Sequence, residues 1–240
     1  KYISTVLFDF RRTVLPQEGI FELLKSLAQI RELESLELNF SGLSNLSDDI
    51  LVNFEPYLPY LRKIKLISFI LSDCHNLTPT AIENISKGLR SANLEDFVLI
   101  LDNCTNLDQA ENDGIKGLWK GLSYLKALSY VRLSLRGWKN GVSLLLSEFK
   151  SFLSLPISKN LKSLILDLEG AQYESGSLAA FIKRLPYLKN LMELNISFAK
   201  SCKLDSGNIE MLADTCYSLR TLQSLDLNFE GCSEVSPSSF

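Results

Sequence analysis

One apolar pattern recurs eight times along the chain at near-constant spacing. Each copy has an apolar residue, two variable residues, and then three apolar residues that alternate with variable ones. Successive first positions are 30, 28, 33, 34, 33, 30 and 31 residues apart. A sustained period of about thirty residues is typical of solenoids, in which each repeat is one supersecondary unit. The copies are Ile3-Val6-Phe8-Phe10, Leu33-Leu36-Leu38-Phe40, Leu61-Ile64-Leu66 (with Ser68 in its last position), Leu94-Phe97-Leu99-Leu101, Leu128-Val131-Leu133-Leu135, Leu161-Leu164-Leu166-Leu168, Leu191-Leu194-Ile196-Phe198 and Leu222-Leu225-Leu227-Phe229.

Each unit combines two hydrophobic periods. The alternation inside each copy predicts a strand with one buried face, which includes Leu164 and Leu166 in the sixth copy. Between copies the period becomes helical, as at Ile20, Leu24 and Leu27. Such a unit is too small to bury its own apolar face, so stacked units must share one core. The sequence therefore predicts an α/β solenoid of about eight units over residues 1–240, as a single domain.

The spacing of the two kinds of element predicts the shape of the stack. Parallel strands lie about 4.8 Å apart, whereas packed helices need about 10 Å. The stack must therefore curve, with a parallel sheet inside the arc and the helices outside. The first unit begins directly with a strand at Ile3, with no polar capping segment before it. We expect the chain to be a fragment of a longer array, whose ends are covered by further chain or by neighbouring subunits.

The turns after three of the strands carry a family resemblance. The segments LSDCHNLTPTAI (71–82), LDNCTNLD (101–108) and FEGCSEVS (229–236) resemble the cysteine-containing, ribonuclease-inhibitor-like class of leucine-rich-repeat proteins. The longer strand of LKSLILDLEGA (161–171) resembles the extended repeats common in single-celled eukaryotes. This resemblance implies a leucine-rich-repeat solenoid over the whole chain. It implies little about function, because such repeats serve many unrelated tasks.

Charge and cysteine usage restrict the classes of partner and compartment. The 25 basic and 28 acidic residues are well mixed, which argues against a nucleic-acid-binding surface. No apolar run approaches the roughly 18 residues that a membrane span needs. The five cysteines are odd in number and widely spaced, which indicates free thiols rather than a disulfide scaffold. We therefore expect the protein in a reducing compartment inside the cell, most of all in the cytoplasm.

The chain has no recognisable catalytic or cofactor motif. It lacks a nucleotide-binding loop, a metalloprotease motif and a nucleophile elbow. His75 follows Cys74, but no second ligand pair stands at metal-binding spacing. Cys104 and Cys232 each lie ten residues after the first apolar position of their unit, which favours a packing role. The sequence thus predicts no metal, no cofactor and no enzymatic activity.

Two tryptophans have different settings. Trp119 lies within a helical apolar pattern, so we expect it in the core. Trp138 lies between two glycines in RGWKNG, where the repeat requires no aromatic residue. It is either a loop plug over the core or an exposed anchor for a partner.

The residues between the buried strand positions should face the inner surface of the arc. At both ends of the array these residues are polar, whereas in the middle several are apolar. An apolar centre with a charged rim is typical of protein-binding surfaces. The predicted binding residues on this concave face are Lys63, Lys65, Ile67, Val98, Ile100, Tyr130, Arg132, Ile165 and Asp167.

These features predict a non-enzymatic module or scaffold subunit that binds a protein within a larger intracellular assembly. Three alternatives use the same repeats: inhibition of an enzyme, substrate selection in a ubiquitin ligase, and GTPase activation. The resemblance supplies the last, because Ran GTPase-activating proteins use this class of repeat and contribute a positioned arginine. Four arginines lie near predicted strand ends, namely Arg11, Arg12, Arg132 and Arg136.

Overall fold

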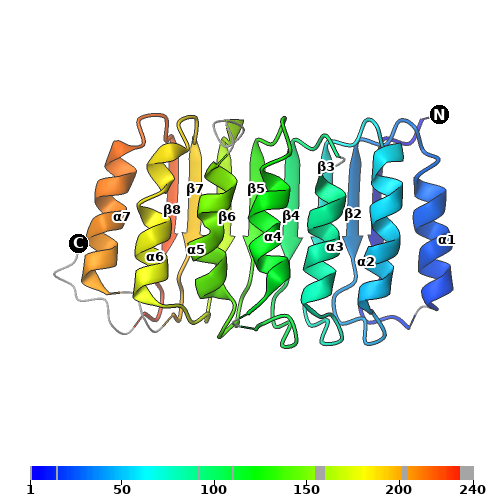
Figure 1. Cartoon of the computed structure of the whole chain (residues 1–240), viewed down its shortest axis with the longest axis horizontal. Helices are drawn as coiled ribbons and strands as arrows, with labels where there is room; N and C mark the ends of the chain where they lie inside the picture. Colours follow the sequence, from blue (N-terminus) through cyan, green and yellow to red (C-terminus); the bar gives the residue numbers. More distant parts are fainter. Residues whose placement is uncertain are drawn as a thin grey trace.

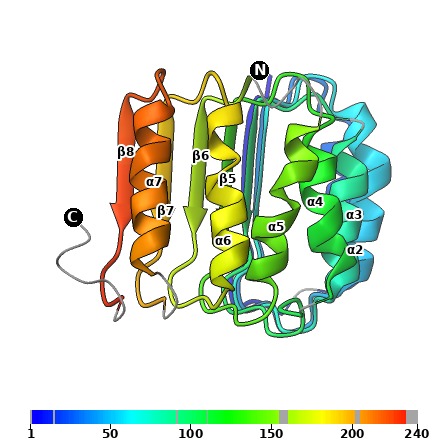
Figure 2. The same ribbon diagram turned by 60° about the vertical axis from the view of Figure 1, so that its left-hand side comes forward.

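The computed structural model describes residues 2–14, 16–90, 92–109, 111–154, 160–201 and 205–232, with side chains left out at 17 and 53–55. Its strands form one parallel sheet in which each strand pairs with the next along the chain. Figures 1 and 2 show the helices in a second layer, all on one side of the sheet. The sheet curves, and the helices lie on its outer side (Figure 2). The strands are β1 (Thr5–Asp9), β2 (Ser35–Asn39), β3 (Leu66–Ile70), β4 (Asp96–Ile100), β5 (Tyr130–Ser134), β6 (Ser163–Asp167), β7 (Glu193–Ser197) and β8 (Ser224–Asn228).

The helices alternate with the strands, as the change of hydrophobic period predicts. The helix after β3 begins at a cap: Thr78 accepts a hydrogen bond from the backbone N–H of Thr80, and Pro79 opens the helix. The helices are α1 (Gln17–Leu27), α2 (Asp48–Phe54), α3 (Pro79–Leu89), α4 (Asp113–Leu122), α5 (Val142–Leu153), α6 (Ser175–Ile182) and α7 (Ser206–Ser218), with 3-10 segments η1 (Glu55–Tyr60) and η3 (Leu185–Tyr187).

The core lies between the two layers and is continuous along the stack. Leu164 and Leu166 are completely buried, which confirms the predicted buried face of this strand. Trp119 is also completely buried, and its indole Nε1 donates to the carbonyl of Leu145 at 2.8 Å. Its ring packs edge-on against Phe149 with the ring centroids 4.9 Å apart. The prediction that Trp119 belongs to the core is confirmed.

The third unit has a different register from the one its sequence suggests. Ile67 pairs with Phe97 of β4 and is completely buried, so it faces the core. The prediction that Ile67 faces the concave side is therefore wrong. The repeat begins at Ile64, and Leu61 is the apolar residue three positions earlier that ends the helical segment, as Leu125 and Leu188 are in their own units. With Ile64 as the first position, the spacings of 28 and 33 become 31 and 30.

A left-handed backbone residue marks the same turn in all eight units. It lies nine residues after the first apolar position, and its φ lies between 55° and 77°. Glycine takes this conformation without steric cost, whereas other residues pay about 1–2 kcal/mol. Four of these turns nevertheless use a larger residue. The series is Arg12, Gly42, Asp73, Asn103, Gly137, Gly170, Lys200 and Gly231, and it is regular only when the third unit begins at Ile64.

The next residue in five of these turns links successive units. In five units its side chain donates a hydrogen bond to the carbonyl of the last apolar strand residue of the preceding unit. The residues that carry these carbonyls are buried, so the bonds satisfy groups that are costly to leave unpaired. The pairs are Cys74 to Phe40 (3.2 Å), Cys104 to Leu71 (3.0 Å), Trp138 to Leu101 (2.7 Å), Ser201 to Leu168 (3.1 Å) and Cys232 to Phe198 (3.0 Å).

The two ends of the sheet are less covered than its middle. In β8, Leu225 is 47% exposed, although its counterpart Leu194 in β7 is completely buried. Val6 and Phe8 in β1 are half-buried. The expectation that further chain or another subunit covers these ends stays a prediction. No helix in the described ranges is long and apolar enough to cross a membrane.

Candidate functional site

The inner face of the sheet presents three rows of side chains, because every second strand residue points away from the helices. Strand pairing without bulges aligns these rows across all eight strands. The first row is Thr5, Ser35, Leu66, Asp96, Tyr130, Ser163, Glu193 and Ser224. The second row is Leu7, Glu37, Ser68, Val98, Arg132, Ile165, Asn195 and Asp226. The third row is Asp9, Asn39, Ile70, Ile100, Ser134, Asp167, Ser197 and Asn228.

An apolar patch occupies the middle of this face. It consists of Leu66 and Ile70 from β3, Val98 and Ile100 from β4, Tyr130 from β5 and Ile165 from β6. All six are half-buried, in contrast to the completely buried residues on the opposite face of the same strands. The structure thus brings together four of the predicted binding residues and replaces Ile67 with Leu66 and Ile70. The patch is larger than the sequence predicts, because the register correction turns two apolar residues inward.

The same correction moves two lysines off the inner face. Lys63 and Lys65 precede β3 and lie at the edge where the strands begin. Lys63 pairs with Glu32 at 2.5 Å, and Lys65 pairs with Glu34 at 2.8 Å. The pairing raises the pKa of Lys65 and lowers that of Glu34, the side-chain hydrogen bond being the largest cause for each. The prediction that Lys63 and Lys65 border the patch on the concave face is therefore wrong.

Ser68 interrupts the apolar patch between Leu66 and Ile70. Its side chain is almost completely buried, and its hydroxyl has no hydrogen-bond partner among the described residues. An unpaired buried hydroxyl costs about 1–3 kcal/mol. Ser68 occupies the last apolar position of the pattern that begins at Leu61. In the observed register, which begins at Ile64, it belongs to the inner face.

Arg132 on β5 lies within the patch, between Val98 and Ile165 of the neighbouring strands, and Tyr130 lies on the same strand. Arg132 is exposed, and Tyr130 is half-buried beside it. Burial raises the pKa of Tyr130, and Arg132 partly opposes this rise. Burial likewise raises the pKa of Asp96 on β4, and the neighbouring Glu95 adds to it by charge repulsion.

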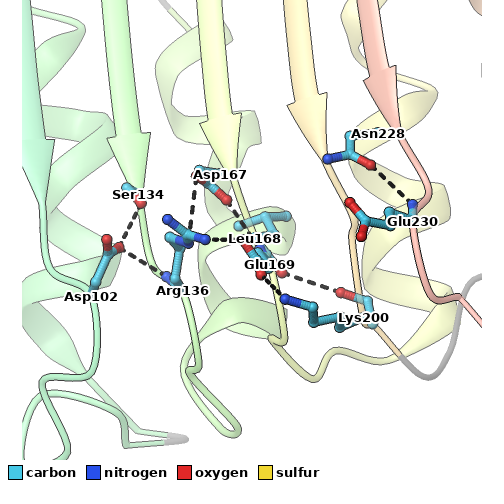
Figure 3. A network of polar contacts seen from close by, with 10 residues as sticks. Asp102, Ser134, Arg136, Asp167, Leu168, Glu169, Lys200, Asn228 and Glu230 are labelled. Atoms are coloured by element: carbon cyan, nitrogen blue, oxygen red, sulfur yellow. Dashed lines mark hydrogen bonds and ion pairs between the residues drawn. The ribbon is translucent and has the colours of Figure 1, made fainter.

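A network of ion pairs closes the edge where the strands end (Figure 3). Arg136 pairs with Glu169 and lies 3.8 Å from Asp167, and Lys200 pairs with Glu169 at 2.5 Å. Ser134 donates to Asp102 at 2.5 Å. Burial raises the pKa of Asp102, and the hydrogen bond from Ser134 partly opposes this rise. Burial also raises the pKa of Asp167, and the charge of Arg136 partly opposes it. The carboxylate of Asp167 therefore already has partners within the protein, namely Arg136 and the backbone N–H of Glu169.

Trp138 is a plug and not an exposed anchor. Its side chain is 1% exposed, and its indole Nε1 donates a hydrogen bond to the carbonyl of Leu101. Of the two alternatives that the sequence leaves open, the structure shows the first. A Cβ on Gly141 would come within 2.8 Å of this ring, so the neighbouring turn is shaped around it.

The cysteines and the histidine form no reactive site within the described residues. Burial raises the pKa of Cys74 to about 11 and that of Cys104 to about 12, so neither is an ionised nucleophile near neutral pH. Cys74, Cys104, Cys216 and Cys232 are free thiols, and Cys202 lies outside the described residues. Among the residues that were placed, no cluster of His, Cys, Asp or Glu has the arrangement of a metal site. His75 is exposed in its turn.

The four candidate arginines fall into two groups. Arg11 is held by the carboxylate of Asp9 at 2.7 Å, and Arg136 is held by Glu169. Arg12 is exposed in the left-handed turn of the first unit. Arg132 alone lies on the inner face of the sheet, at its centre. An arginine that reaches into a partner's active site must be extendable, which favours Arg132 over Arg11 and Arg136.

Comparisons with known proteins bear on the fold. Neither the protein-family models nor the curated proteins gave a match to this sequence. Among solved structures, the chain is similar to a chain in the crystal structure of the Rad7 and Elc1 complex in yeast, with 16% identity and a TM-score of 0.56. The likeness covers 99% of this chain and 52% of that one, so this chain spans about half the length of its structural neighbour.

A second match is to the actin-binding site 2 of leiomodin-1, with 12% identity and a TM-score of 0.42. It covers 84% of this chain and 88% of that one. The parallel sheet, the single helical layer and the likeness to the Rad7–Elc1 structure together show an α/β solenoid of the leucine-rich-repeat type.

Proposed function

We propose that this protein is a non-enzymatic interaction module that binds a protein partner on the concave face, through the apolar patch. The observation that carries the proposal is the patch itself: six half-buried apolar side chains on four adjacent strands, which the fold does not need for its own core. Contiguous exposed apolar surface is costly in water and typically marks an interaction site.

The surroundings of the patch have the composition of an interface rim. Asp96 and the edge network around Arg136 border the patch, and Arg132 lies within it between Val98 and Ile165, so apolar side chains are combined with charged groups. The structural neighbour belongs to a complex of two proteins, which agrees with an interaction role for this kind of repeat array.

GTPase activation through Arg132 is the second candidate function. The position of Arg132 on the inner face is the observation that favours it.

The finer assignments are part of the same proposal. The side-chain donors of Cys74, Cys104 and Cys232 at one turn position support the cysteine-containing class of leucine-rich repeats. Their free thiols support an intracellular, reducing compartment. A single domain that continues into a longer array, with the exposed Leu225 covered by the next unit or subunit, fits a scaffold role.

Replacing Val98 or Ile100 with glutamate is expected to abolish partner binding and leave the fold intact. Both side chains point away from the core, and a carboxylate at the centre of the interface would have to be desolvated against apolar groups when the partner binds. The matched control is Lys120→Glu on the outer face of α4, which is exposed. Affinity capture from native extract is compared for the wild-type chain and the three variants, with circular dichroism as the measure of folding.

The expected result is one protein retained by the wild-type chain and by Lys120→Glu, and lost with both patch variants. Loss with Lys120→Glu alone would place the interface on the helices. Unfolding by either patch variant would mean that Val98 and Ile100 are core residues.

A further inference from the structure

The carboxylates on the inner face are unevenly distributed along the arc. The three inward rows contain six carboxylates, namely Asp9, Glu37, Asp96, Asp167, Glu193 and Asp226, and one cation, Arg132. Glu37 lies on β2, before the apolar patch, and Glu193 and Asp226 lie on β7 and β8, after it. In the middle, the charge of Arg132 offsets that of Asp96 on the neighbouring strand, and Arg136 offsets that of Asp167. The face is therefore acidic at both ends and close to neutral at its apolar centre.

The carboxylates at the two ends of the face have no cationic partner, unlike Asp9 and Glu169 near the strand ends. Among the described residues, no ion pair involves Glu37, Glu193 or Asp226. Glu193 accepts a hydrogen bond from the Ser163 hydroxyl at 2.6 Å, and Asp226 accepts one from the Asn195 amide at 3.0 Å. These neutral donors orient the carboxylates without neutralising them. By contrast, Asp9 and Glu169 are occupied by arginine or lysine.

Strand spacing sets the distance between the two acidic ends. Five strand steps separate β2 from β7, which is about 24 Å along the sheet at roughly 4.8 Å per step. An extended segment covers this length in about seven residues, at roughly 3.3 Å per residue. A helix covers it in about sixteen residues, at roughly 1.5 Å per residue.

We infer that the partner binds with one segment that runs across the strands, has an apolar middle and carries lysine or arginine at both ends. This inference rests on the proposed function and adds the chemistry of the occupant. The apolar middle covers the patch, and the cationic ends meet Glu37 on one side and Glu193 with Asp226 on the other. Arg132 repels a cation placed in the middle, so the order of charges in the segment matters as well as their number. A polyanion such as nucleic acid would meet repulsion at both ends.

Synthetic peptides test this order directly against the whole chain. One peptide has lysines at both ends and an apolar middle of about seven residues. Its isomer has the same composition with the lysines in the middle. A second pair has a helix-forming middle of about sixteen residues. Fluorescence anisotropy at low salt measures the affinity of each peptide for the wild-type protein.

Three variants of the chain complete the experiment. The first combines Glu37→Gln, Glu193→Gln and Asp226→Asn, which removes the end charges. The control combines Glu18→Gln, Glu210→Gln and Asp214→Asn, three exposed carboxylates on the helices α1 and α7, so its change in net charge is the same. The third is Ile100→Glu, which places a charge in the patch.

In at least one pair, the peptide with cationic ends should bind about tenfold more tightly than its isomer, and high salt should remove the preference. The inner-face triple variant should lose this preference, and the helix control should keep it. Equal affinity within both pairs, an effect of the helix control equal to that of the inner-face variant, or no binding of any peptide would overturn the inference. If Ile100→Glu abolishes binding while the inner-face triple variant does not, the inference fails and the proposed function stands. If neither variant changes binding, both fail.

Discussion

Replacing Trp138 with alanine is expected to lower the free energy of unfolding by about 3–5 kcal/mol, the range for a buried aromatic residue truncated to alanine. The side chain is almost completely buried in the turn after β5, and it joins the fifth unit to the fourth through its bond to the Leu101 carbonyl. Removing the ring leaves a cavity and takes away one of that carbonyl's donors. Gly141, which packs against the ring with no Cβ, cannot fill the space. Urea denaturation followed by circular dichroism measures the change.

Two controls separate the contributions. Trp138→Phe keeps much of the ring volume but loses the hydrogen bond, so its effect should be smaller than that of the alanine variant. Lys139→Ala alters the exposed neighbour of Trp138 and should change stability by less than about 0.5 kcal/mol. A loss below about 1 kcal/mol for Trp138→Ala would contradict the plug and restore the exposed-anchor interpretation.

Replacing Ile67 with aspartate is expected to prevent folding, whereas the same change at Ile70 is expected to be tolerated. Ile67 is completely buried opposite Phe97, and an unpaired carboxylate there would cost several kcal/mol, a large part of the stability of a typical domain. Ile70 belongs to the same strand but points to the concave face, so Ile70→Asp should cost no more than about 1 kcal/mol.

The pair tests the register of the third unit, because the register suggested by its sequence predicts the opposite result. Soluble yield and the circular-dichroism spectrum are compared for the two variants. A folded Ile67→Asp protein together with an unfolded Ile70→Asp protein would show that the two faces of β3 are exchanged.

Most of the fold could be predicted because each repeat is locally consistent. Seven of the eight copies align with the observed strands, since their strand alternation and the helical period before them agree. The third copy fails because Leu61 and Leu66 are both apolar at the positions that a shifted pattern requires. A shift by an odd number of residues, here three, exchanges the two faces of a strand, so this single ambiguity misplaced Ile67 and both lysines.

The signal for the right register was nonetheless in the sequence. Cys74 lies ten residues after Ile64, as Cys104 does after Leu94 and Cys232 after Leu222. The turn therefore identifies the unit more reliably than its apolar residues do. The hydrogen bonds of these thiols to the preceding unit give the physical reason for that spacing.

The candidate site was predictable in composition but not in detail. Val98, Ile100, Tyr130 and Ile165 follow from alternation alone, because β4, β5 and β6 are correctly registered. Alternation does not show which charged side chains already have a partner within the protein and which could bind another molecule. Asp167 is engaged by Arg136, two residues beyond the end of β5, whereas Glu37, Glu193 and Asp226 have no such partner among the described residues. These contacts depend on how neighbouring turns meet in space.

Site-specific photo-crosslinking tests most directly whether the concave face is the binding surface. p-Benzoylphenylalanine is introduced in place of Arg132, at the centre of the inner face, or in place of Lys120, on the outer face of α4. Both positions are exposed, so the fold should accept the larger side chain at either site. After irradiation in native extract, a partner crosslinked from position 132 but not from position 120, and lost when Ile100→Glu is added, is the predicted result. Crosslinks from position 120 alone would contradict the account.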